Sequence, residues 1–239
     1  MAFVLHLLDE AFARIAGGDG ALVETALRTL WFASLATLFA LLAGLPLALW
    51  LADGRTRARR IGLTLANAGL GLPPVVLGVY LALLLLPASP LGGLSWDYRP
   101  PAVVLAQTLL ALPIVVALSA AALRTLPPGL LEQARAFGAS RPQRALLALR
   151  EARVGLAAAV IATLGSALAE VGAVVIVGGN IRGSTNTLAS TVLLDLAASD
   201  TPGAIADALV LVALLLLLAL VLTLVQQGRT RDATAEGLV

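Results

Sequence analysis

Residues 208–225 read ALVLVALLLLLALVLTLV and contain no charged residue. A helix needs about 20 mostly apolar residues to cross the hydrocarbon core of a bilayer, and a charge-free run of this length is typical of such a span. The run lies within a longer apolar segment, residues 203–226. The sequence therefore predicts a membrane-spanning helix in this part of the chain.

Four further segments have a similar length and apolar content. They are residues 25–52, 61–87, 101–123 and 154–178. Pro73 and Pro74 interrupt the second segment, and Glu170 and Gly172 interrupt the fourth. We expect both helices to be broken or kinked, which a membrane protein tolerates where neighbouring protein satisfies the backbone. The pattern predicts an all-α transmembrane protein with about five spans.

The composition agrees with this fold and excludes several kinds of chemistry. Hydrophobic residues make up 59% of the chain and charged residues 13%, which is about half the share in soluble domains. There is no cysteine, and His6 is the only histidine, so no cysteine or histidine metal site is expected. Lysine is also absent, which excludes a Walker A loop. We therefore expect no catalytic residues, no cofactor and no ATP hydrolysis by this chain.

The arginines are distributed unevenly among the segments that connect the spans. Twelve follow span 1, lie between spans 3 and 4, or lie in the C-terminal segment: Arg55, Arg57, Arg59, Arg60, Arg124, Arg135, Arg141, Arg144, Arg150, Arg153, Arg229 and Arg231. The other four are Arg14, Arg28, Arg99 and Arg182. Because cytoplasmic loops are enriched in basic residues, the sequence predicts an N-out, C-in topology. The position of these arginines beside spans explains the net charge of +2 without nucleic acid.

The domain organisation follows from these segments. Residues 1–24 form an outer segment in which Phe3, Leu7, Leu8, Phe12 and Ile15 recur near helical spacing, as in an amphipathic helix that lies on a membrane surface. A frayed tail is the alternative. Residues 25–228 then form one transmembrane domain, and residues 229–239 form a cytoplasmic tail.

A segment on the expected cytoplasmic side, residues 124–153, reads RTLPPGLLEQARAFGASRPQRALLALREAR. Pro127 and Pro128 suit the start of a helix, and Gly138 suits a left-handed position that ends it. Ser140 and Gln143 have the spacing of a capping box for a second helix. We expect two short helices that meet at a glycine turn. The alternative is an ordinary helical loop rich in arginine.

Five groups of residues resemble motifs of known permeases. Glu132-Gln133-Ala134, followed by Gly138, resembles the E-A-A-x-x-x-G motif of binding-protein-dependent ABC importer permeases, with Gln133 in place of an alanine. Glu170-Val171-Gly172-Ala173 and GNIRGSTNTL at residues 179–188 resemble the G-E-F-G-A and G-N-I-x-G-x-T-x-T-L motifs of molybdate, tungstate and sulfate permeases. PPVVLG at residues 73–78 resembles a further motif of these permeases, and EAR at residues 151–153 is similar to their tungstate-type branch.

The resemblance implies a type I ABC importer permease in a bacterial or archaeal cell membrane. Such a permease imports an oxyanion, here with tungstate favoured over molybdate or sulfate, as part of a homodimer with two ATPase subunits and an extracytoplasmic binding protein. The resemblance assigns contact with the ATPase to Glu132, Gln133, Ala134 and Gly138.

The remaining motif residues are candidates for the translocation path or its gate. They are Glu170, Gly172, Gly179, Asn180, Arg182, Gly183, Thr185 and Thr187. Backbone N–H groups and hydroxyls after span 4 could solvate an oxyanion, and Arg182 would add positive charge. The favoured alternative is that this segment packs beneath a docked binding protein or forms a gate.

Glu170 is an ionisable residue within a predicted span, where charge is costly. It shares a helix face with the small residues Ala158, Ala162 and Ser166, which would allow another helix to approach closely. We expect Glu170 to fix the helix or to gate the path, since a carboxylate would repel an oxyanion. A rival hypothesis makes Glu170 the proton site of an ion-coupled secondary carrier, but such carriers are often built from repeats, which the hydropathy does not show.

Overall fold

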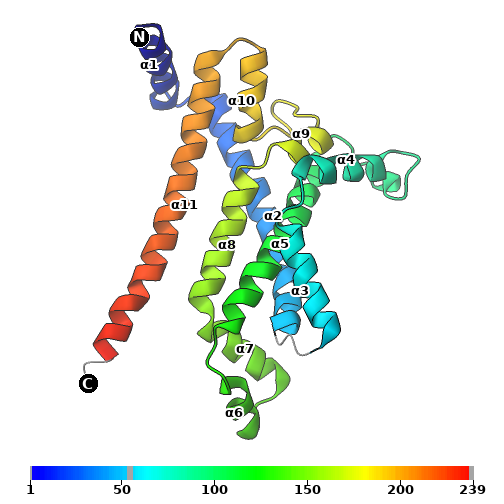
Figure 1. Cartoon of the computed structure of the whole chain (residues 1–239). Coiled ribbons are helices and arrows are strands. Elements are labelled where there is room, and N and C mark those ends of the chain that lie inside the picture. The colour runs from blue at the N-terminus through cyan, green and yellow to red at the C-terminus, as the bar shows by residue number, and fades with distance from the viewer. Residues whose placement is uncertain (1, 53–55, 237–239) are drawn as a thin grey trace. The chain divides into compact units, whose positions relative to one another are not determined.

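The computed structural model describes residues 2–52 and 56–236, so Arg55 and the last three residues of the expected tail lie outside the described residues. The described residues form eleven α-helices and one short 3-10 turn, η1 (Gly92–Leu94), without a strand (Figure 1). Three helices are long and apolar enough to cross a membrane: α2 (Gly20–Ala52), α5 (Pro100–Arg124) and, over its first 24 residues, α11 (Thr201–Glu236). These helices confirm the first, third and fifth predicted spans.

The second and fourth predicted spans are each built from two helices. They are α3 (Arg57–Gly69) with α4 (Pro74–Leu85), and α8 (Arg153–Leu168) with α9 (Gly172–Gly178). If each broken pair counts as one span, the described chain has five. The first break occurs at Pro73 and Pro74, as predicted, because proline at the first position of a helix loses no intrahelical hydrogen bond.

Several boundaries differ from the sequence prediction. Helix α1 (Ala2–Ala16) confirms a helix in the N-terminal segment, but α2 begins at Gly20, inside the range assigned to that segment. Helix α11 continues without interruption to Glu236, past the predicted start of the tail at residue 229. Helix α10 (Leu188–Ala197) was not predicted at all.

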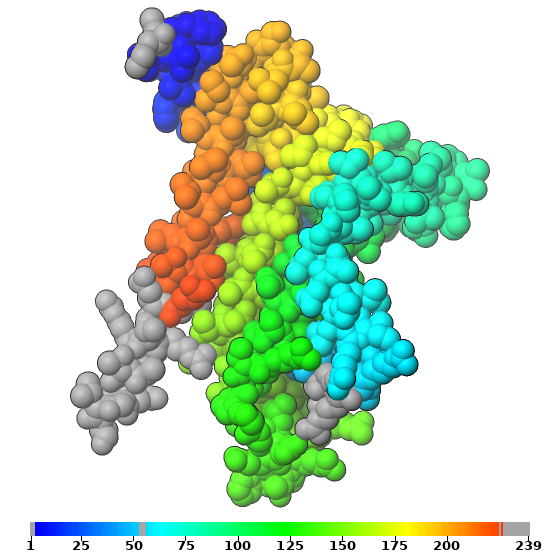
Figure 2. Space-filling view, viewed as in Figure 1, coloured from blue at the N-terminus to red at the C-terminus, as the bar shows by residue number. Residues whose placement is uncertain are grey.

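The chain forms two compact units. The first contains Met1–Phe39, Leu72–Ala111 and Leu164–Leu217, and the second contains Ala40–Gly71, Leu112–Thr163 and Leu218–Val239. In the first unit, a core joins α2, α4, α5 and α9 through Phe32, Leu81, Leu85, Val103, Val174 and Val177. In Figure 2, α1 (blue) lies beside the first turns of α11 (orange), consistent with an ion pair between Arg14 and Asp200.

Helices α4 and α9 of the first unit pack unusually closely. A β-carbon on Gly78 would lie 2.9 Å from the Cα atom of Ala173, and one on Gly172 would lie 2.8 Å from Cγ2 of Val75. Each helix thus presents a glycine to the other, which lets the two backbones approach. Two motifs that are about a hundred residues apart in the sequence meet at this contact.

The second unit has a core of its own, made by α2, α3, α5 and α7 (Arg141–Glu151). It contains Ala48, Leu51, Leu63, Val116, Ala120, Leu123 and Ala148. Arg124 donates a hydrogen bond from Nε to the carbonyl oxygen of Ala52 at 3.1 Å, which ties the end of α5 to the end of α2. Helix α6 (Leu130–Ala136) precedes α7 in the same unit, which also contains the first part of α8.

Candidate functional site

Glu170 lies at the break in the fourth span and acts as a helix cap. Its Oε1 atom accepts a hydrogen bond from the backbone N–H of Ala173 at 2.9 Å. This N–H belongs to the first turn of α9, where backbone donors have no intrahelical partner and a negative charge is favourable. The half-buried carboxylate therefore helps α9 to begin after the three residues that separate it from α8.

Gln107 of α5 supports the other side of the same break. Its Nε2 atom donates a hydrogen bond to the carbonyl oxygen of Ala167 at 3.0 Å, and the Gln107 side chain is fully buried. Ala167 is in the last turn of α8, where carbonyl oxygens lack helical partners. The polar side chains of α5 and of the break thus replace backbone hydrogen bonds that an unbroken helix would make.

After α9, the chain turns through three residues with positive φ: Gly179 at 68°, Asn180 at 50° and Gly183 at 72°. Glycine is required at 179 for a second reason, because a β-carbon there would lie 2.7 Å from Cδ1 of Tyr98. The side chain of Asn180 donates to the carbonyl oxygen of Ser190 at 3.0 Å. The turn is therefore held to the start of α10.

Thr185 and Thr187 are completely buried and use their hydroxyls within this segment. Thr185 Oγ1 donates to the carbonyl oxygen of Gly178 at 2.5 Å and accepts from the N–H of Ile181 at 2.9 Å. Thr187 Oγ1 caps α10 by accepting from the N–H of Ser190 at 3.3 Å. These contacts favour the packing role over direct solvation of a substrate, because the hydroxyls are already engaged.

The segment is also anchored on α2. The Thr29 hydroxyl accepts a hydrogen bond from the N–H of Leu188 at 2.8 Å, and Arg28 Nε donates to the carbonyl oxygen of Asn186 at 3.0 Å. Asn186 is buried and donates from Nδ2 to Thr191 Oγ1 at 2.8 Å. We define residues 179–187 as the span-4 loop, which is a compact structure fixed to α2 and α10.

Arg182 is the exposed charged residue of the span-4 loop. Its partner, Asp195, was not predicted from the sequence. The Nη2 atom of Arg182 lies 2.5 Å from Oδ1 of Asp195 in α10; the Arg182 side chain is 57% exposed and the Asp195 side chain 6%. A carboxylate inside the apolar run LASTVLLDLA at residues 188–197 was the available signal, since such a residue usually has a partner.

A polar cavity of about 190 Å³ adjoins this ion pair. Its charged lining residues are Arg14, Asp19, Arg182, Asp195, Asp200 and Asp207. Four carboxyl groups outnumber two guanidinium groups, which makes the cavity unfavourable for a dianion. The charged groups here are better explained as structural contacts that hold α1, the span-4 loop, α10 and α11 together.

The second candidate site is the turn between α6 and α7 in the second unit. Gly138 has a φ of +86°, which confirms the predicted left-handed position. The backbone N–H of Ser140 donates to Gln143 Oε1 at 2.8 Å, which confirms the predicted capping contact. The prediction that Pro127 and Pro128 start the first helix is wrong, because they form a turn and α6 begins at Leu130.

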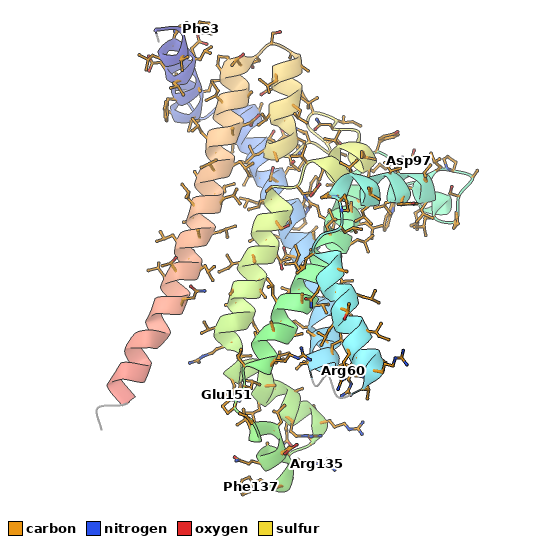
Figure 3. All side chains as sticks on the ribbon, viewed as in Figure 1. Phe3, Arg60, Asp97, Arg135, Phe137 and Glu151 are labelled. Carbon is orange, nitrogen blue, oxygen red and sulfur yellow. The ribbon has the colours of Figure 1, made fainter. Side chains whose placement is uncertain are left out.

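The predicted coupling residues lie together on α6 and its end. Glu132, Gln133 and Gly138 are exposed, and Ala134 is half-buried. Phe137, which was not predicted, is 91% exposed at the helix end and points away from α6 in Figure 3, where Arg135 is also labelled. A cavity of about 650 Å³ beside α6 is lined by Glu132, Arg135 and Arg144.

Residues 44–231 match the family of binding-protein-dependent transport system inner membrane components. The chain belongs to this family. The permease is 34% identical over 200 residues to a probable anion ABC transporter permease protein of Haloferax volcanii, covering 82% of this chain and 86% of the relative. It is 31% identical over 183 residues to the tungstate uptake system permease protein TupB of Peptoclostridium acidaminophilum, covering 77% and 80% of the two chains.

The fold of the permease is also found among solved structures. A chain of the MetNI methionine ABC transporter, in an inward-facing conformation, superposes with a TM-score of 0.61 over 90% of this permease and 95% of that chain, at 24% identity. These findings confirm the predicted all-α, type I importer fold and the location in a cell membrane. The roles of the individual site residues stay predictions.

Proposed function

We propose that this permease forms half of the membrane pore of an ABC importer for tungstate. The observation that supports the permease role is the family match over residues 44–231, and the similarity to a tungstate uptake permease supports the substrate. Molybdate and sulfate are the rival substrates within the family. ATP is hydrolysed on partner subunits, because this chain has no lysine for a Walker A loop.

The partner permease is a second copy of this chain. Ala162 and Ser166 on α8 are exposed and lie four residues apart, on one face of the helix. Small residues at this spacing allow close approach of another helix in a membrane. Five spans are also few for enclosing a path, whereas two copies could form it between them.

Coupling to the ATPase runs through the α6–α7 turn. Phe137 stands almost fully exposed beside Gly138, and a large aromatic side chain that becomes buried is a common anchor of protein interfaces. Glu132 and Gln133 are exposed on the same short helix. Movement of the ATPase would be transmitted to α7 and then to α8, which follows it after one residue.

The gate lies at the break of span 4. Glu170 fixes the start of α9, and Gly172 keeps α9 against α4, so a movement of α9 carries α4 with it. Arg182 lies beyond α9, and its ion pair uses one of five N–H donors of the guanidinium group. The ion pair between Arg182 and Asp195 holds the span-4 loop to α10 next to the gate.

The proposed function is tested by transport in reconstituted vesicles. The permease is combined with its ATPase and its binding protein, and the accumulated tungsten, molybdenum and sulfur are measured by mass spectrometry. ATP-dependent accumulation of tungstate at trace concentration, with little competition from excess molybdate or sulfate, is the expected result. Preference for another oxyanion would exclude tungstate as the substrate. Uptake driven by a proton gradient without ATP would instead identify a secondary carrier.

A further inference from the structure

A cavity of about 450 Å³ lies between α2 and α5 in the first unit. Two rows of residues, each four apart in the sequence, form its walls: Trp31, Leu35 and Phe39 on α2, and Pro100, Val104 and Thr108 on α5. Residues at this spacing follow one side of a helix. Eight residues of helix are about 12 Å long, so the cavity is elongated along both helices.

The chemistry of the cavity excludes a charged ligand. None of the described residues that line it is charged. The one hydroxyl among them, that of Thr108, already donates to the carbonyl oxygen of Val104 at 2.7 Å. An apolar void that stays empty forgoes the dispersion contacts of the atoms around it. The lining therefore favours an occupant that is apolar and elongated.

Two tryptophans of α2 place the cavity relative to the bilayer. Trp31 is 62% exposed and Trp50 is 49% exposed, and they are 19 residues apart on the same helix. This spacing matches the roughly 20 residues that cross the hydrocarbon core, and tryptophan is enriched at both surfaces of that core. Trp31 and Trp50 therefore mark the two membrane surfaces on α2.

The length of α2 supports the same placement independently. The helix has 33 residues, so every stretch of about 20 residues within it includes residues 33–39. Leu35 and Phe39 thus lie in the hydrocarbon core wherever its surfaces meet the helix. The cavity extends from the membrane surface at Trp31 inward to Phe39.

Helix α5 contributes a further tryptophan to the surface end of the cavity. The last residue of α5, Arg124, donates a hydrogen bond to the last residue of α2, Ala52, so the two helices run in the same direction. Trp96 lines the cavity just before α5 begins, and it therefore lies at the same end as Trp31. An indole group has an apolar body and a polar N–H, which suits the level of lipid headgroups.

We propose that this cavity binds one acyl chain of a membrane phospholipid, whose headgroup lies at Trp31 and Trp96. Half of a hydrocarbon core about 30 Å thick is about 15 Å, so an acyl chain that enters at the surface reaches the inner end of the cavity. Thr29, two residues before Trp31, accepts the hydrogen bond that holds the start of α10. By packing against both helices, the lipid stabilises the part of α2 to which the span-4 loop is fixed.

The chain has three tryptophans, of which two line the cavity, so their fluorescence permits a direct test. Trp50→Phe retains the two cavity tryptophans, and Trp31→Phe/Trp96→Phe retains Trp50 as the matched control. The whole chain is titrated in detergent with phosphatidylcholine that carries two bromine atoms on one acyl chain, because bromine quenches only tryptophans that it contacts. We expect quenching of Trp50→Phe to reach a plateau at one lipid per chain, and quenching of the control to rise weakly without a plateau.

A second pair of variants fills the cavity without removing a tryptophan. Leu35 and Leu105 line the cavity, whereas Leu38 and Leu109 are exposed on the same two helices outside it. In the Trp50→Phe background, Leu35→Phe/Leu105→Phe should weaken lipid binding several-fold or more. Leu38→Phe/Leu109→Phe makes the same chemical change and should leave the binding unchanged.

Three results would overturn the proposal. Equal quenching in Trp50→Phe and in its control would mean that lipid merely coats the whole surface. Equal affinities of the two leucine variants would place the bound acyl chain elsewhere. Quenching that occurs in monomers but not in an isolated dimer would mean that a second copy of the chain covers the cavity. The titration needs neither ATP nor a transported anion, so its outcome is independent of the proposed transport function.

Discussion

The hydroxyl of Thr185 donates a hydrogen bond to the carbonyl oxygen of Gly178 and accepts one from the N–H of Ile181. The side chain thereby joins the end of α9 to the middle of the span-4 loop. Thr185 has no exposed surface and Gly178 is buried, so water cannot replace the bond between them.

Replacement Thr185→Val keeps the shape of the side chain and removes both hydrogen bonds. Leaving the buried carbonyl oxygen of Gly178 without this partner costs about 1–3 kcal/mol, so the variant should unfold at a clearly lower temperature than the natural protein. Thermal unfolding of the purified permease, followed by circular dichroism, measures the difference. Thr185→Ser keeps the hydroxyl and is the control. If the valine variant were as stable as the serine variant, the hydroxyl would not hold the loop.

Replacement Gly138→Val should impair coupling to the ATPase. The residue has a φ of +86°, where a β-branched side chain is strained, although its β-carbon would meet no atom within 4 Å. The matched control is Gly93→Val, because Gly93 also has open space but no positive φ. Co-purification of the ATPase and substrate-stimulated ATP hydrolysis are the measurements. Normal stimulation in the Gly138 variant would contradict the coupling role.

Replacement Phe137→Ala tests the proposed anchor without altering the backbone. We expect about a tenfold or greater loss of affinity for the ATPase, since truncation of a central interface aromatic often costs about 2 kcal/mol or more. Stability of the isolated permease should be unchanged, because the side chain is 91% exposed. Leu146→Ala, another exposed apolar residue in the same unit, is the control. Equal affinities for both variants would remove Phe137 from the interface.

Replacement Glu170→Gln separates charge from capping. Glutamine retains an oxygen that can accept from the N–H of Ala173, so the complex should assemble normally, whereas loss of the charge should slow transport if Glu170 acts in the gate. Glu170→Ala removes the cap as well and should cost about 1 kcal/mol of stability. Uptake and thermal stability are measured for both. Uptake by the glutamine variant at the natural rate at every pH would leave capping as the role of Glu170.

The ion pair between Arg14 and Asp200 makes the attachment of α1 sensitive to acid. The folded-state pKa of Asp200 lies below its unfolded value of about 3.9, so its stabilising contribution is present above that pH and is lost as the pH falls through the lowered pKa. A nitroxide at Ala13→Cys should therefore become more mobile in acid, and Asp200→Asn should give this mobility at pH 7. Glu24→Gln, which removes an exposed ion pair with Arg28, is the control. An immobile label in the Asp200 variant would show that packing alone holds α1.

The N-out, C-in topology is tested by fusing reporters after Arg231. A reporter that is active only in the cytoplasm should function there. A fusion that requires export should be inactive, because the arginine distribution places the C-terminal segment in the cytoplasm. Activity of the exported reporter would mean that the orientation or the number of spans differs from the prediction.

The spans could be predicted because their signal is local. A run such as residues 208–225 is apolar enough to identify a span without knowledge of its neighbours, and Pro73 and Gly138 impose backbone conformations that depend only on their own residue type. Helix α10 was missed because Asp195 interrupts its apolar pattern, and the residue that compensates for this charge, Arg182, lies in a different segment. The hydrogen bonds of Thr185 depend on the path of the span-4 loop, which no local pattern encodes.

The contact between Gly78 and Ala173 constrains which sequences can form this fold. A side chain at position 78 would meet a Cα atom rather than a flexible side chain, so no change of residue at position 173 can make room for it. Compensation would require the whole of α9 to shift, although α9 is also held by Glu170 at its start and by Tyr98 beside Gly179 at its end. Among natural variants of this permease, position 78 should therefore remain glycine even where the residues around it vary freely.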